Sequence, residues 1–230
     1  TRAVIDMPET DGIFHYFDTN TSRVGLGALV KRFDGHKVAI IGLGGTGSYI
    51  LDLVAKTPVS EIHLFDGDDL LTHNAFRAPG AASLAELRER PRKADHWAKI
   101  YGKMHRGVVP HPEKLDASNV AMLAAMDFVF IAIDDGPAKR LIVEKLEDLN
   151  LPFIDVGIGV QVVGDQLLGL VRVTASKPGR RRHVHEAQRI SFTAGDNDAA
   201  YAKNIQIADL NAMNACLAVI KWKKLIGFYV

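Results

Sequence analysis

Short apolar runs alternate with longer segments of helical period from residue 37 onward, and this alternation constrains the fold more than any other feature. The pattern is typical of βαβ units, in which helices cover both faces of a parallel sheet. Strands are expected at residues 38–41, 61–65, 108–110, 128–133 and 153–156. Helices are expected between them, at residues 47–56, 93–103, 119–125 and 137–149. We therefore predict an α/β chain with a Rossmann-like, mostly parallel sheet.

The pattern changes after residue 151, where the apolar runs 160–163 and 167–173 are separated by only three residues. So short a connection predicts a hairpin, and therefore antiparallel strands at the C-terminal edge of the sheet. Residues 175–202 are polar and rich in turn formers, which predicts a long crossover loop. Residues 204–228 carry apolar side chains at spacings of three or four, as an amphipathic helix does. This helix should close the core or make a dimer contact.

Charge and cysteine content exclude several classes of protein. The chain has 28 Lys+Arg against 27 Asp+Glu, so no overall field attracts nucleic acid or an anionic membrane. It has neither a signal-type segment nor the roughly 18 to 20 consecutive apolar residues of a membrane helix. Cys216 is the only cysteine, so an intramolecular disulfide and a cysteine-built zinc site are impossible. We expect a cytoplasmic protein, and because the sequence starts at Thr1 we expect fused or associated neighbouring domains.

A glycine-rich turn follows the first predicted strand directly. It contains Gly42, Gly44, Gly45 and Gly47 and leads through Ser48 into a predicted helix. Glycines let the backbone come close to a phosphate, and the helix N-terminus offers free N–H groups and a positive dipole end. The spacing of the glycines also fits the dinucleotide fingerprint. An ATP site and an NAD site therefore compete at this point.

Charged residues after the later strands favour a triphosphate. The second strand ends in Asp66, in the place of a ribose-binding acid, and Asp68 follows it. The cations Arg77 and Lys93 come next, and they suit a triphosphate whose pyrophosphate must be neutralised as it leaves, whereas hydride transfer needs no such pair. The fourth strand is followed by Asp134, a carboxylate placed to hold magnesium at the carboxyl edge of the sheet.

These motifs, taken in order, resemble the ThiF/MoeB superfamily, the adenylating domains of ubiquitin-activating enzymes and their bacterial relatives. The resemblance rests on residues 42–48, Asp66 with Asp68, Asn74 with Arg77, Pro91 with Lys93, and Asp134 with Arg140. It implies ATP-dependent adenylation of the C-terminal glycine carboxylate of a ubiquitin-like or sulfur-carrier protein. On this basis we divide the chain into an N-terminal arm and helix, residues 1–33, and an ATP-binding adenylation domain, residues 34–230.

The resemblance also assigns roles to single residues. Asp66 would hold the ribose, whereas Asn74, Arg77 and Lys93 would contact the phosphates and Asp134 would bind Mg²⁺. Relatives pair so that an arginine of one N-terminal arm reaches the partner's phosphates, and Arg23 is the candidate in this chain. The resemblance therefore implies a homodimer.

The sequence departs from the family pattern at three places. Ala78 stands where the family usually has Gln, and Asp135 stands where it usually has Asn. The loop at residues 175–202 contains no cysteine for a thioester. Two alternatives stay open: an NAD-dependent oxidoreductase, which would leave Arg77 and Lys93 unexplained, and a catalytically inactive nucleotide-binding scaffold.

Side chains outside these motifs are assigned to packing or to solvent. Cys216 lies between apolar neighbours in the C-terminal helix and is expected in the core. Trp97 and Trp222 are expected to pack, and His183 and His185 are expected to be solvated.

Overall fold

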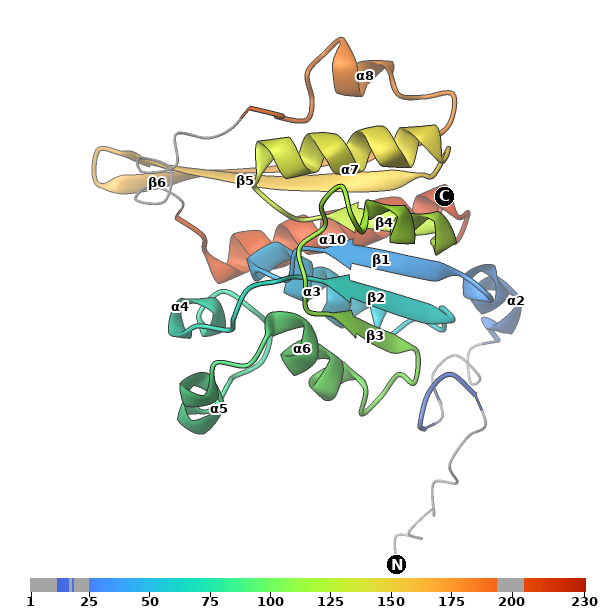
Figure 1. Cartoon of the computed structure of the whole chain (residues 1–230), viewed down its shortest axis with the longest axis horizontal. Coiled ribbons are helices and arrows are strands. Elements are labelled where there is room, and N and C mark those ends of the chain that lie inside the picture. The colour runs from blue at the N-terminus through green and yellow to red at the C-terminus, as the bar shows by residue number, and fades with distance from the viewer. Residues whose placement is uncertain (1–11, 17, 19–24, 194–204) are drawn as a thin grey trace, which may run out of the picture.

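The computed structural model describes residues 12–16, 18, 25–193 and 205–230 and is built around a six-stranded sheet (Figure 1). The strands lie in the order β3-β2-β1-β4-β5-β6. Their bounds are β1 Lys37–Ile41, β2 Glu61–Phe65, β3 Val108–His111, β4 Phe128–Ile131, β5 Phe153–Val163 and β6 Gln166–Ser176. The first five strands are mutually parallel and β6 is antiparallel to β5, which confirms the predicted fold class.

The register of the strands aligns the carboxyl ends of β1, β2 and β4. Ile41, the last residue of β1, lies beside Phe65 of β2 and Ile131 of β4. Ile131 lies beside Asp155 of β5, a strand that continues to Val163. The segments that follow β1, β2 and β4 therefore meet at one edge of the sheet, where open α/β folds bind their ligands. β5 differs from the prediction because it runs without a break through residues 157–163, which were expected to include a separate strand.

Helices cover both faces of the sheet, as the continuous apolar runs of the strands require. One face packs against α3 (Gly45–Val54), α6 (Lys93–Tyr101) and α10 (Ala208–Leu225). The other packs against α7 (Gly136–Asp148) and the 3₁₀ helix η2 (Val120–Ala125). Trp97 is 4% exposed and Trp222 is fully buried, so both tryptophans pack as predicted.

The C-terminal helix α10 corrects the prediction for Cys216, whose side chain is exposed. The buried face of α10 instead carries Asn211, Asn214, Ala215, Ala218, Val219 and Trp222. Cys216 belongs to a second stripe, which it forms with the exposed Met213, Leu217 and Ile220. Since Cys216 is one residue and about 100° of helical rotation beyond Ala215, its apolar sequence neighbours did not indicate which face it occupies.

Two short helices lie between β2 and α6 and were not predicted: α4 (Thr72–Ala75) and α5 (Leu84–Glu89). A capping box marks the start of α5, because Ser83 Oγ accepts from the Glu86 backbone N–H while the Glu86 carboxylate accepts from the Ser83 backbone N–H. The Ser-x-x-Glu signature of this box is present in the sequence. Both helices are too short to show a clear apolar period.

The predicted N-terminal helix at residues 23–33 is represented by α2 (Gly27–Val30) and the 3₁₀ helix η1 (Lys31–Phe33). Arg23 itself lies outside the described residues. The first two residues of the predicted loop 175–202 belong to β6, and α8 (Arg182–His185) lies within the loop. Residues 194–202 of the loop lie outside the described residues. Among the described residues, no helix has the length and apolarity needed to cross a membrane.

Candidate nucleotide-binding site

The glycine turn between β1 and α3 is held tightly on one side and is open on the other. Gly42 has a φ of +87°, and a Cβ there would stand 2.5 Å from the carbonyl oxygen of Ala132. A Cβ on Gly47 would collide with the carbonyl oxygen of Gly42. At Gly44, which precedes the first residue of α3, a Cβ would meet no atom within 4 Å. The turn therefore leaves open space at the N-terminus of α3, where the first backbone N–H groups have no intrahelical acceptors.

Asp66, at the end of β2, organises this turn. Its Oδ2 accepts a 2.6 Å hydrogen bond from the Leu43 backbone N–H, and its Oδ1 accepts a 2.9 Å bond from the Asp68 backbone N–H. The side chain is 7% exposed. The predicted ribose ligand is thus also the group that fixes the glycine turn to the end of β2.

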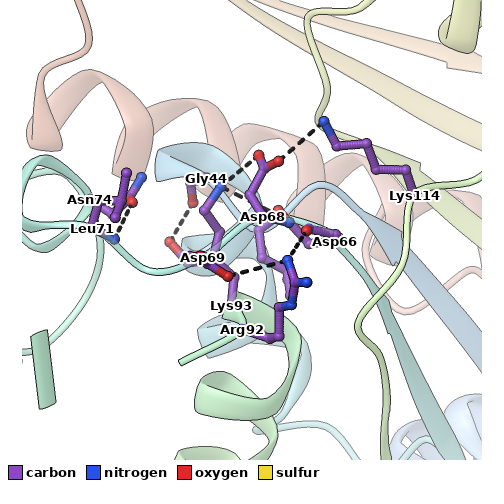
Figure 2. Close-up of polar contacts among 12 residues, drawn as sticks. Gly44, Asp66, Asp68, Asp69, Leu71, Asn74, Arg92, Lys93 and Lys114 are labelled. Carbon is purple, nitrogen blue, oxygen red and sulfur yellow. Dashed lines mark hydrogen bonds and ion pairs between the residues drawn. The ribbon is translucent and has the colours of Figure 1, made fainter. Parts of the chain in front are cut away.

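Several charged side chains gather around Asp68 (Figure 2). Lys93 Nζ lies 3.0 Å from Asp68 Oδ2 and 3.6 Å from Asp66 Oδ1. Lys114 Nζ lies 3.2 Å from Asp68 Oδ1, and Arg92 pairs with Asp69 at 3.2 Å. Partial burial acts to raise the pKa of Asp68, but the hydrogen bonds and charges of Lys93 and then Lys114 lower that pKa below its usual value.

Asn74 and Arg77 are positioned by α4 and by contacts with α10. Asn74 is 2% exposed, and its Oδ1 accepts a 2.8 Å hydrogen bond from the Leu71 backbone N–H. Its buried Nδ2 has no hydrogen-bond partner among the described residues. Asn211 of α10 donates to the Arg77 carbonyl oxygen at 3.3 Å and accepts from Thr46 Oγ1 at 2.9 Å. The sequence analysis did not identify Asn211, which connects the glycine turn to the end of α4.

Asp134 lies beyond the end of β4 with an exposed side chain. The Ala132 backbone N–H donates to the Ile41 carbonyl oxygen at 2.7 Å, so this segment runs beside the glycine turn. Asp135 is the N-cap of α7, where its carboxylate accepts a 3.0 Å hydrogen bond from the Ala138 backbone N–H. An Asp in place of the family's usual Asn therefore preserves a helix cap.

A hollow of about 480 Å³ lies between α4 and α5 and was not foreseen from the sequence. Its lining includes His73, Arg88 and Arg90. Desolvation lowers the pKa of His73, and the positive charges of Arg77 and Lys93 lower it further. A positive field thus extends from the two predicted phosphate-binding cations into this hollow.

The two histidines noted in the sequence each have a protein partner, and His185 is 50% exposed, as expected, whereas His183 is partly buried. His183 Nε2 lies 2.9 Å from the Ala175 carbonyl oxygen, and His185 Nε2 lies 2.9 Å from a carboxylate oxygen of Glu147. Within residues 12–16, 18, 25–193 and 205–230, no three His, Cys, Asp or Glu side chains are grouped to hold a metal ion. A single exposed carboxylate such as Asp134 fits Mg²⁺, which takes one or two carboxylates together with nucleotide phosphates.

A buried carboxylate, Asp155 on β5, lies at the same edge of the sheet and was also missed. It contacts Lys139 of α7 and Arg172 of β6, at 2.9 and 2.8 Å. The available signal was a lone aspartate inside an apolar strand.

Comparison with known proteins gives both a family and a fold. The model of the ThiF family matches residues 18–221. The structure is similar to PaaA, with 18% identity, a TM-score of 0.61 and coverage of 88% of this chain and 59% of PaaA. It is also similar to E. coli MccB solved with ATP, with 19% identity, a TM-score of 0.63 and coverage of 88% and 59%. No curated protein sequence matches the chain.

A third similar structure is E. coli TcdA, named as a tRNA N6-threonylcarbamoyladenosine dehydratase. Its identity is 17%, its TM-score is 0.60, and the match covers 90% of this chain and 92% of TcdA. At these identities the likeness is one of fold. The chain thus spans 59% of the length of PaaA and MccB but nearly the whole of TcdA.

Proposed function

This chain belongs to the ThiF family, and on that premise we propose that it is an adenylyltransferase that uses ATP and Mg²⁺. Its substrate would be the C-terminal carboxylate of a ubiquitin-like or sulfur-carrier protein, and pyrophosphate would be released. The observation that carries the proposal is the open backbone at Gly44, which lies at the same sheet edge as Asp66, Lys93 and Asp134. A nicotinamide site would give no role to the cation Lys93 or to the second carboxylate, Asp134.

Each site residue has a proposed task. The N–H groups at the start of α3 would face the phosphates. Ser48 is fully buried and its Oγ donates to the carbonyl oxygens of Gly44 and Gly45, so it would support the turn rather than contact the phosphates. Arg77 and Lys93 would neutralise the leaving pyrophosphate, and Asn74 would contribute a phosphate contact. Asp66 would hold the ribose and Asp68 would keep Lys93 in place. Magnesium, held by Asp134, would supply charge neutralisation between the phosphates, and catalysis would then consist of positioning and electrostatic stabilisation.

The similar structures bear on the identity of the acceptor. MccB has been solved with ATP and with MccA, whereas TcdA is named as a tRNA dehydratase. These acceptors differ, so the fold does not select one. We favour a protein with a C-terminal glycine because the net charge of +1 offers no overall attraction for nucleic acid. A cytoplasmic location, and any neighbouring domain, belong to the same proposal.

A homodimer is part of the proposal, and exposed apolar surface supports it. On α10 the exposed stripe is Met213, Cys216, Leu217 and Ile220. The end of the β5–β6 hairpin exposes Val162, Val163, Leu167, Leu168 and Leu170. Exposed apolar surface of this kind marks interfaces.

Mixing Arg23→Ala chains with Asp134→Ala chains tests the dimer, because one active site should be restored in each mixed dimer. If light scattering shows a monomer that is fully active, both the interface and the role of Arg23 are wrong.

Calorimetric titration with ATP·Mg²⁺ and with NAD tests the nucleotide. We expect binding of ATP·Mg²⁺ that weakens in Lys93→Met and is unchanged in Lys99→Met, an exposed cation of the same helix. Tight NAD binding without an ATP signal would establish the oxidoreductase alternative. Exchange of labelled pyrophosphate into ATP, measured with any small glycine-terminated protein that proves to be encoded beside the gene, then tests the acceptor. ATP binding without exchange for any acceptor would favour an inactive scaffold.

A further inference from the structure

Three charged side chains form a cluster at the carboxyl edge of the sheet, in which Asp155 and Lys139 are buried and Arg172 is 35% exposed. Asp155 is fully buried, and its two oxygens contact Lys139 Nζ at 2.9 Å and Arg172 Nη2 at 2.8 Å. Lys139 is 4% exposed. Two cations and one carboxylate leave a net charge of +1, so the cluster is not a balanced pair.

The cluster lies level with the nucleotide site. Asp155 is paired in register with Ile131, the last residue of β4, and Ile131 is paired with Ile41, the last residue of β1. The glycine turn follows Ile41 directly, and Asp134 comes three residues after Ile131. The charges of the cluster are therefore held at the edge from which both nucleotide-binding segments begin.

Through Lys139 the cluster reaches the start of α7. Lys139 is in the first turns of this helix, four residues after its N-cap Asp135. Asp134 immediately precedes that cap, so the Lys139–Asp155 contact fixes the start of the helix that follows Asp134. Lys139 also differs in kind from the other buried residues of α7. It is charged, whereas the others are small or apolar: Gly136, Ile142, Val143 and Leu146.

Through Arg172 the cluster reaches residues 182–193, which we call the strap. Arg172 Nη1 donates to the Arg189 carbonyl oxygen, and Thr174 Oγ1 donates to the same oxygen at 3.3 Å. Gly157, opposite Arg172 on β5, makes room for the guanidinium, because a Cβ there would stand 2.7 Å from Nη2.

The strap in turn packs against the start of α7. A Cβ on Gly136 would collide with the Thr193 carbonyl oxygen, and the Arg140 guanidinium lies 5.0 Å from the centre of the Phe192 ring. One buried carboxylate thus connects β5, α7 and the strap.

Fold stability alone does not account for such a cluster, because well-packed apolar side chains of similar volume are often as stabilising as buried charges. We propose that Asp155, Lys139 and Arg172 are positioning residues that hold the start of α7 and the strap, and so place Asp134 for the magnesium of the nucleotide. This inference rests on the proposed function. Partners that orient a metal ligand typically change metal affinity or activity by roughly 10- to 100-fold when they are removed.

The test compares wild type, Asp134→Ala and the triple variant Asp155→Leu/Lys139→Met/Arg172→Met, in which apolar side chains replace the whole cluster. ATP affinity is measured by calorimetry at increasing Mg²⁺, and folding is followed by thermal unfolding. We expect the triple variant to unfold at or above the wild-type temperature. We also expect Mg²⁺ to raise its affinity for ATP much less than it raises that of wild type, as in Asp134→Ala. Arg182→Gln/Glu186→Gln, which removes an exposed ion pair of the same strap, should behave as wild type.

The outcomes separate the two levels of inference. A folded triple variant with wild-type Mg²⁺ dependence, beside an Asp134→Ala variant that has lost it, overturns the positioning role alone. Wild-type Mg²⁺ dependence in Asp134→Ala overturns the metal assignment on which both proposals rest. If the triple variant does not fold, the single variant Arg172→Lys is tested in its place. It keeps a cation beside Asp155, but its side chain is shorter and extends less far toward the Arg189 carbonyl oxygen. A wild-type Mg²⁺ response in that variant overturns the proposal, and a weakened one supports it.

Discussion

Two clusters of charge lie at the same edge of the sheet and differ in burial. Around Asp68 the carboxylate and one of its cations are open to water, with Asp68 52% and Lys114 76% exposed, while Lys93 is 8% exposed. Around Asp155 the carboxylate and Lys139 are closed off, at 0% and 6% exposed, while Arg172 is 35% exposed. Exposed ion pairs contribute little to stability and can exchange a partner for a ligand, whereas a buried charge that loses its partner is left without water to replace it. We therefore expect the first cluster to bind and the second to position.

The pKa directions of the two carboxylates follow this difference. The hydrogen bonds and charges of Lys93 and Lys114 outweigh burial at Asp68 and lower its pKa. At Asp155 burial is the largest effect and acts to raise the pKa, while Lys139 and Arg172 oppose it. Similar partners thus give different results because the Asp155 carboxylate is fully buried whereas the Asp68 carboxylate is 52% exposed.

The largest expected effect is on stability and comes from Asp155→Asn. This change leaves the buried Lys139 without a counter-charge, which should lower the free energy of unfolding by about 3 to 5 kcal/mol. Urea denaturation measures it. If Asp155→Asn unfolds at the wild-type urea concentration, the cluster is not closed off from water as the structure indicates.

Asp134→Ala should show the opposite behaviour to Asp155→Asn. Because Asp134 is exposed, we expect an unchanged unfolding curve but a loss of transition-state stabilisation of about 3 kcal/mol, a rate decrease of roughly a hundredfold. Exchange of pyrophosphate into ATP measures the rate. Glu144→Ala, which removes an exposed carboxylate of α7, is the matched control. An Asp134→Ala enzyme with wild-type exchange would show that this carboxylate takes no part in the reaction.

A smaller effect compares the two faces of α10. Cys216→Ala should change the free energy of unfolding by no more than about 0.5 kcal/mol, because the side chain is exposed in the isolated chain. A water-soluble thiol reagent should react with Cys216 in dilute protein and more slowly as dimers form. Equal reaction rates at all protein concentrations would place the interface away from this stripe.

The smallest effect is the acid sensitivity of Asp68. A carboxyl whose pKa is lowered by folding contributes stability above its unfolded pKa, near 3.8, and that stability is lost as the pH falls through the folded pKa. Asp68→Asn should therefore show a shallower loss of stability on acidification below about pH 4 than wild type does. Thermal unfolding across this pH range measures the slope. Identical slopes would mean that Lys93 and Lys114 do not stabilise the Asp68 carboxylate in solution.

Much of the architecture could be predicted because its signals are local. The bounds of β2 agree with the prediction, and β1 begins one residue earlier than expected. The glycine turn and Asp66 were found because turn chemistry and strand ends are read from adjacent residues. The start of α5 was also readable, since Ser83 and Glu86 carry the capping-box spacing, but its six residues gave no period.

The sequence by itself determined the parallel strands, the longer helices and the edge of the sheet where the candidate site lies, because apolar period and glycine spacing act between near neighbours. Tertiary structure decided the rest. Asp155 is paired with Lys139 and Arg172, which are 16 and 17 residues away, by the packing of a helix and a strand against β5. Cys216 faces outward because α10 packs through Ala215 and Ala218. Burial and partnership are properties of the packed molecule, where a single helical rotation or strand register decides whether a side chain meets water or another residue.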